Sequence, residues 1–153
     1  MTGVAKWLGL PSFASAFDPA TRGKVHFTSA LRNPVFFNGA NYNGQIGMLS
    51  APALVTMIET LLAEEVRSLP NAVWQPLGER PLQALEHLAA KGVLSRSQIA
   101  PVLPHPSGAN AERISFFLGN KNASDLSPKT NGPKILALRQ SLERFYNTQQ
   151  EAA

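Results

Sequence analysis

A single histidine stands between two prolines in the segment Leu-Pro-His-Pro-Ser-Gly-Ala-Asn, residues 103–110. Proline fixes φ and removes a backbone donor, so we expect His105 to be held with little conformational freedom. A neutral imidazole can donate a hydrogen bond to a developing anion, and a protonated one adds positive charge. Ser107 and Asn110 supply short polar groups beside it. The pattern predicts a rigid loop that touches a ligand through His105.

The loop leads into a predicted helix over residues 110–118. The N-terminal end of a helix presents backbone N–H groups and a positive dipole to a neighbouring anion. Arg113 lies on the first turn of this helix, within reach of a phosphate. A second interpretation stays open, in which Ser107 or Asn110 caps the helix and His105 is an ordinary loop residue.

Extended and helical patterns alternate along the chain and would position this loop. Runs of alternating or continuous apolar residues predict strands over 24–31, 72–76 and 99–103. Apolar residues at helical spacing predict helices over 50–68, 79–91, 110–118 and 133–147. This order predicts an α/β fold, a three-layer α/β/α arrangement with a short, mostly parallel sheet. In such sheets ligands bind at the carboxyl ends of the strands, which is where the histidine loop begins.

A second group of polar residues follows the first predicted strand. Ser29 and Arg32 stand at its end, and Asn38 and Asn41 lie in an asparagine-rich turn just beyond. A parallel sheet would bring them to the same edge as His105. Asparagine offers both a donor and an acceptor to the edge of a base. The alternative is that the asparagines serve only the turn, because Asn-Gly pairs are strong turn signals.

The composition limits the classes of function. The 153 residues fit one domain, 1–153, and an apolar content of 44% can bury a core. The net charge of +4 is compatible with a polyanionic partner. The chain contains no cysteine, which excludes disulfides, thiolate catalysis and cysteine-ligated zinc. His26 and His87 do not combine with His105 at any metal-ligand spacing, so we expect no metal.

The sequence shows no signal for a membrane. The N-terminal segment lacks the apolar core of a signal peptide. The longest uncharged stretch, residues 33–58, is interrupted by Gly, Asn and Pro, so it does not predict a membrane span. We therefore expect a cytoplasmic protein.

Three pieces of the chain together resemble the uracil-DNA glycosylase superfamily. Residues 103–110 resemble its His-Pro-Ser motif, and residues 74–78 resemble the Pro-Leu-Gly strand end that precedes it. Residues 28–32, Thr-Ser-Ala-Leu-Arg, resemble a Thr-Asn-Ala-Val-Lys strand end, with Ser29 in the place of the asparagine that helps to hold the base. The resemblance covers residues 24–121.

The resemblance implies that the chain binds DNA and a base that is flipped out of the duplex. His105 would stabilise negative charge on the leaving base as the N-glycosidic bond to uracil is hydrolysed. The residues that follow, from Ser107 through Gly108 to Asn110, would contact the DNA backbone or enter the base stack. No cofactor is implied.

One part of the superfamily pattern is not found in this sequence. The family has a first strand and a glycine-rich loop that carries a water-positioning acid or asparagine. Asp18 and Asp125 are the only aspartates, and neither follows a strand and a glycine loop. We therefore expect a sheet that is incomplete at its N-terminal strand, a chain that matches the C-terminal part of a glycosylase domain, and weak or absent uracil excision.

Two other classes of function stay open. A sheet that lacks an edge strand could pair with a partner chain or with a second copy, which would make this a non-catalytic α/β interaction module. A hydrolase that acts on free nucleosides or sugars at the same loop is a third interpretation. Salt-sensitive DNA affinity would favour the glycosylase-like class over the interaction module.

Overall fold

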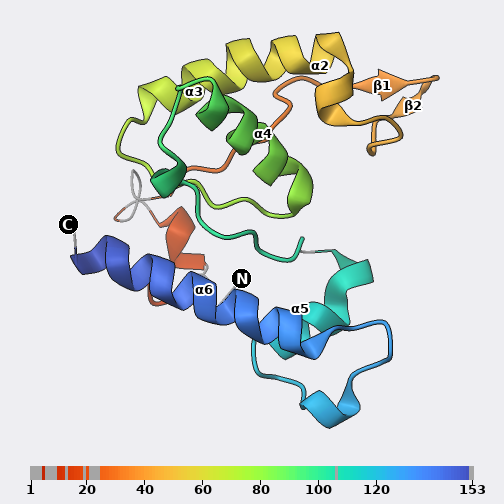
Figure 1. The fold of residues 1–153 in the computed structure, drawn as a ribbon, viewed down its shortest axis with the longest axis vertical. Helices are drawn as coiled ribbons and strands as arrows, with labels where there is room; N and C mark the ends of the chain where they lie inside the picture. The colour runs from red at the N-terminus through yellow and green to blue at the C-terminus, as the bar shows by residue number, and fades with distance from the viewer. Residues whose placement is uncertain are drawn as a thin grey trace. The chain divides into compact units, whose positions relative to one another are not determined.

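The computed structural model describes residues 5, 10–12, 14–18, 20, 25–105 and 107–151. The chain divides into two compact units, which Figure 1 shows with their elements labelled. Unit 1 comprises Met1–Phe27 and Leu103–Ala153, and unit 2 comprises Thr28–Val102. Each unit is described by itself. That residues 1–153 form one domain stays a prediction.

Unit 2 is mainly helical. Its elements, in order, are the strands β1 (Phe36–Phe37) and β2 (Ala40–Asn41), η3 (Met48–Ser50), α2 (Pro52–Met57), η4 (Ile58–Leu62), α3 (Ala63–Ser68), α4 (Glu79–Ala90) and η5 (Arg96–Gln98). The only named strands in the described part of the chain are β1 and β2, which form a two-stranded antiparallel sheet. The prediction of a three-layer α/β/α fold with a mostly parallel sheet is therefore wrong.

The segments predicted as the second and third strands meet in a parallel bridge between Trp74 and Ile99. Trp74 N donates to Gln98 O at 2.8 Å and Ala100 N donates to Trp74 O at 2.9 Å, which pairs Trp74 with Ile99. The next bond of a parallel ladder would require the N–H of residue 76, and residue 76 is proline. That one backbone bond is therefore missing, although Leu77 and Leu103, just beyond, are again bridge residues.

A side chain links the two segments where the ladder cannot. The Gln75 amide Nε2 donates to Pro101 O at 2.8 Å. Trp74 is buried in the core of unit 2. The apolar run 72–76, which predicted a sheet strand, is thus an extended segment that packs in the core.

The first predicted strand, 24–31, is also wrong, because Val25 is only a bridge residue and no strand follows it in this range. Residues 26–31 adopt no strand, and residues 26–29 are all exposed. An alternating pattern predicts a strand only when one of its faces is buried. Lys24 lies outside the described residues. The segments that predicted the parallel sheet do not form it. The prediction that this sheet lacks its N-terminal strand therefore falls with it.

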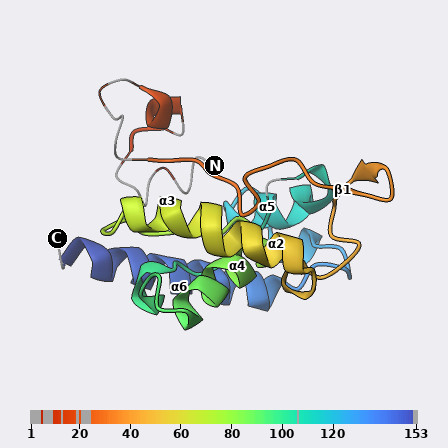
Figure 2. The ribbon, with the colours of Figure 1, turned by 90° about the horizontal axis from the view of Figure 1, so that it is seen from above.

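Residues 52–68 follow one another as α2, η4 and α3 along one rod, which Figure 2 shows from above. The middle piece, η4, is a π-helix, and Ala63 N donates to Ile58 O, five residues back. The wider turn shifts which side chains face the core. Leu62 is 2% exposed, whereas its neighbour Leu61 is 37% exposed.

The prediction of a helix over 79–91 is confirmed by α4, which ends one residue earlier. Gly92 has a φ of 73°, and Val93 N donates to Leu88 O at 3.0 Å. This is a glycine-terminated helix end. The core of unit 2 comprises Met48, Leu54, Ile58, Leu62, Ala63, Val66, Trp74, Ala84, Leu85, Leu88 and Leu94.

Unit 1 contains η1 (Ala14–Phe17), η6 (Gly108–Asn110), α5 (Ala111–Phe117), η7 (Ala123–Asp125) and α6 (Gly132–Glu151). The last helix begins one residue before the predicted Pro133 and confirms that prediction. Ile135, Leu142 and Tyr146 are buried along α6, at the spacing expected for one helical face. Among the residues described, no helix is long and apolar enough to cross a membrane.

Leu62 and Leu61 provide a matched pair for testing the core of unit 2. We expect Leu62→Ala to lower the free energy of unfolding by about 2–5 kcal/mol, because it leaves a cavity between packed helices. Leu61→Ala should change it by no more than about 1 kcal/mol, since that side chain is already partly in water. Urea denaturation followed by circular dichroism measures both. Equal losses in the two variants would contradict the register shift at the π-helix.

Candidate functional site: the loop around His105

The backbone carbonyl of His105 is the centre of the loop. It accepts a hydrogen bond from Ser107 N at 2.8 Å and another from Asn110 Nδ2 at 3.1 Å. These two bonds tie Ser107 and Asn110 to the His105 carbonyl; Pro106 lies outside the described residues. We expected proline to constrain this loop. The structure adds a second constraint, the Asn110 side-chain amide, which is bound to the main chain.

Asn110 links three parts of the loop. Besides His105 O, its Nδ2 donates to Ser107 Oγ at 3.3 Å, and its Oδ1 accepts from Arg113 Nη1 at 3.2 Å. Neither Ser107 nor Asn110 makes a side-chain hydrogen bond that caps the following helix. Both residues do occupy N-cap positions, Ser107 before η6 and Asn110 before α5, so the interpretation in which they serve the helix start stays open. Asn110 also connects the turn to the first turn of α5.

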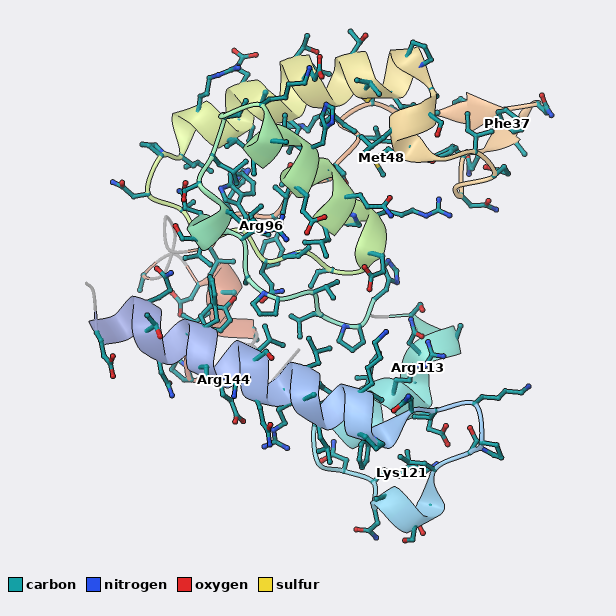
Figure 3. All side chains as sticks on the ribbon, in the orientation of Figure 1. Phe37, Met48, Arg96, Arg113, Lys121 and Arg144 are labelled. Atoms are coloured by element: carbon teal, nitrogen blue, oxygen red, sulfur yellow. The ribbon has the colours of Figure 1, made fainter. Side chains whose placement is uncertain are left out.

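The loop presents two nitrogen-bearing side chains to solvent. His105 and Arg113 are both exposed, and Figure 3 labels Arg113 on α5. A Cβ added at Gly108 would meet no heavy atom within 4 Å, so the space beside the turn is open. An imidazole and a guanidinium beside such a space can donate hydrogen bonds to anionic or carbonyl oxygens. This arrangement suits a phosphate or the oxygen of a base.

Glu112 holds the segment that follows α5, a role the sequence reasoning missed. Its carboxylate accepts from Lys121 Nζ at 2.8 Å, from Ser127 N at 3.1 Å, from Ser127 Oγ at 2.6 Å and from Thr130 Oγ1. These donors, led by Lys121, hold the pKa of Glu112 well below its usual range. Four hydrogen bonds to one carboxylate tie the loop containing η7 to α5.

A signal for Glu112 was present but ambiguous. An acid in the first turn of a helix is ordinarily explained by the helix dipole. The bonded donors lie 9 to 18 residues farther along the chain. Only the folding of residues 119–131 brings them to the carboxylate.

The other predicted site residues lie in unit 2. Arg32 pairs with Glu65 of α3, and Thr28 Oγ1 donates to the same carboxylate at 2.7 Å. The Glu65 side chain is only 9% exposed, so this pairing anchors the Thr-Ser-Ala-Leu-Arg segment to the helix. Ser29 is exposed between these anchors.

Asn38 and Asn41 are also exposed, and both belong to the β1–β2 hairpin. The structure therefore groups Ser107, Gly108, Asn110 and Arg113 with His105 in unit 1. It places Ser29, Arg32, Asn38 and Asn41 in unit 2. The shared sheet edge that was expected to join the two groups is not formed.

A further titratable cluster lies on the helices of unit 2. His87 Nε2 and Lys91 Nζ of the α4 region approach Glu59 Oε1 at 2.7 Å and 3.1 Å. The hydrogen bond from His87, followed by that from Lys91, lowers the pKa of Glu59. In the described part of the chain, no three His, Asp or Glu side chains gather as a metal site would require. This cluster therefore acts as an ion pair between helices.

The chain is similar to the uncharacterized protein YoxB of Bacillus subtilis (strain 168), with 30% identity over 123 residues. The match covers 79% of this chain and 48% of YoxB, so the chain spans about half the length of that relative. No family model and no solved structure matches the chain.

The Glu112 network predicts a specific dependence of stability on pH. A carboxylate whose folded pKa is lowered stabilises the fold above its unfolded pKa, near 4.5, and loses that contribution as the pH falls. We expect Glu112→Gln to melt below the unsubstituted chain at pH 7, with the difference shrinking as the pH drops below 4.5. Thermal denaturation at a series of pH values measures this.

Glu143→Gln is the matched control, because Glu143 makes one exposed ion pair with Arg139 on α6. Its melting temperature should stay close to that of the unsubstituted chain throughout the series. A difference for Glu112→Gln that is constant with pH would contradict the role assigned to the carboxylate.

Proposed function

We propose that this chain is a DNA-binding, uracil-DNA glycosylase-like protein whose His105 loop contacts a base and the phosphate next to it. The observation that supports this is the Asn110 amide, which fixes the turn at His105 and holds Arg113 beside it. The proposal stands on this loop and on the sequence resemblance. It does not draw on the fold, since the parallel sheet implied by the resemblance is not formed by the segments that predicted it.

The two exposed side chains have complementary roles in this proposal. His105 donates a hydrogen bond to an oxygen of the base, where negative charge grows as the base departs. Arg113 binds a phosphate oxygen. A guanidinium carries five N–H donors, and the bond to Asn110 uses one of its terminal nitrogens. Asn110 thus orients the guanidinium while other donors point to the ligand.

In this proposal the chain binds DNA but catalyses uracil excision weakly or not at all. Activation of water by a general base typically accelerates a reaction about 10²–10⁴-fold. The sequence contains no first-strand motif that would supply that base, so DNA binding is expected with weak or absent uracil excision. The cytoplasm, where bacterial DNA lies, is the compartment that this function requires.

Substitution of Arg113 tests the phosphate contact. We expect Arg113→Gln to weaken binding to a uracil-containing duplex about tenfold, and to reduce the slope of log K against log salt by about 0.9, the value for one lost phosphate contact. Fluorescence anisotropy with a labelled oligonucleotide at several salt concentrations measures both quantities.

Arg144→Gln is the control, because Arg144 is an exposed arginine of the same unit that contacts Ser141 on α6. It removes the same charge from the chain away from the loop. Equal losses of affinity in the two variants would mean that binding follows net charge only and would refute the site.

Uracil release tests the catalytic part of the proposal. We expect the 153-residue chain to release little or no uracil from uracil-containing DNA, measured by alkaline cleavage of a labelled strand. Substantial release that disappears in His105→Ala would overturn the expected lack of water activation. It would also show that a group elsewhere in the chain activates the water.

A further inference from the structure

We propose that the β1–β2 hairpin is a separate binding element for single-stranded DNA, in which the Phe36 ring stacks on an unpaired base. The inference rests on the proposed function only for the class of ligand, since it concerns unit 2 and uses none of the residues of the His105 loop. Four observations support it: the position of Phe36, the rigidity of the hairpin, the charge around it and the small apolar area that it offers.

Phe36 is paired with an amide on an exposed face. The register places Phe36 directly opposite Asn41, so the two side chains lie on the same face of the hairpin. Phe36 is 66% exposed and Asn41 is exposed. An aromatic ring can stack on any base, and an amide beside it can bond to the edge of that base.

The hairpin holds this pair in a defined geometry. Asn38 and Gly39 form its two-residue turn with φ values of 50° and 78°, as in a type I′ turn. Tyr42 N donates to Val35 O at 2.9 Å and continues the pairing past the strands. Figure 1 shows the hairpin extending beyond the start of α2. The ring of Phe36 is therefore presented without a large loss of backbone freedom on binding.

The surroundings of the hairpin suit a polyanion. The chain carries no aspartate or glutamate between Asp18 and Glu59. Arg80 of α4 donates through Nη2 to Gly44 O at 3.1 Å, in the loop just after β2. Any side chain at Gly44, where φ is 90°, would overlap this guanidinium. The glycine thus lets an exposed arginine lie against the hairpin loop, where it can meet a phosphate.

The small exposed apolar area of the hairpin favours a nucleic-acid base over a protein as the partner. A phenylalanine buries about 150–250 Å² when fully covered. A stable protein interface needs about 800 Å² from each partner. Strands of two residues also offer few free backbone groups for pairing with another chain. A stacked base matches the size of this exposed aromatic surface.

Phe36→Ala tests the proposal in the full chain, with a labelled, uracil-free oligo-dT of twelve nucleotides as the probe. We expect it to weaken binding about tenfold or more, as loss of one stacked base does. Phe36→Tyr should retain the affinity. Leu49→Ala, which truncates another exposed apolar side chain of unit 2, should leave it unchanged.

The salt dependence of oligo-dT binding distinguishes the contribution of base stacking from that of phosphate contacts. Phe36→Ala should keep the slope of log K against log salt, whereas Arg80→Gln should reduce it by about 0.7, the value for one phosphate of a single strand. Inorganic polyphosphate, which has no bases, should bind equally to the unsubstituted chain and to Phe36→Ala.

Three results would overturn the proposal. The first is unchanged oligo-dT affinity in Phe36→Ala. The second is an equal loss of polyphosphate affinity in that variant. The third is a dimer in size-exclusion chromatography that Phe36→Ala dissociates, with no binding of oligo-dT. The function proposed for the His105 loop fails separately, through Arg113→Gln on the duplex probe, so the two failures can be told apart.

Discussion

The missing N–H of Pro76 is a constraint on how the two extended segments of unit 2 can pair. A parallel sheet starts at Trp74 and Ile99, with two good backbone hydrogen bonds, and the next donor in the ladder is absent. Gln75 replaces the lost backbone bond with its side-chain amide. The apolar residues of unit 2 are buried mainly by helix packing, along α2, the π-helix and α4.

Glutamates connect elements that the backbone alone does not join. Glu65 of α3 binds Thr28 and Arg32, Glu59 binds His87 and Lys91 of the α4 region, and Glu112 of α5 binds three residues of the loop beyond it. Each of these three glutamates has at least one basic partner, in a chain with 14 basic and 10 acidic residues. The cost of ordering such long side chains is offset best when one carboxylate accepts several bonds, as Glu112 does.

The two candidate binding elements share a design in which a short loop is closed by local hydrogen bonds. At His105 the closing group is the amide of Asn110, and in the hairpin it is an Asn-Gly turn. Each leaves a ring side chain exposed, an imidazole in one case and a phenyl group in the other. Preorganised loops of this kind lose little conformational entropy when they bind a ligand.

Local features were predictable because they depend on neighbours in the sequence. Gly92 ends α4, and Asn38 with Gly39 makes the hairpin turn, since both need a positive φ that glycine and asparagine tolerate. The helical spacing of apolar residues likewise located α4 and α6. The constrained turn at His105 was expected from proline, although the amide of Asn110 that closes it was not.

The arrangement of these pieces needed the tertiary structure. The apolar runs before Pro76 and Pro104 are as suitable for a core segment as for a strand, and in the structure they form extended core segments with only isolated bridges. In the π-helix the backbone hydrogen bond reaches back five residues and not four, and Leu61 lies at the surface. The regular spacing of an α-helix does not predict this position. The sequence by itself determined the turns, the helix ends and the types of side chain in the two loops. Only the tertiary structure decided which distant donors reach Glu112 and Glu65, because those contacts depend on how the chain folds back over many residues.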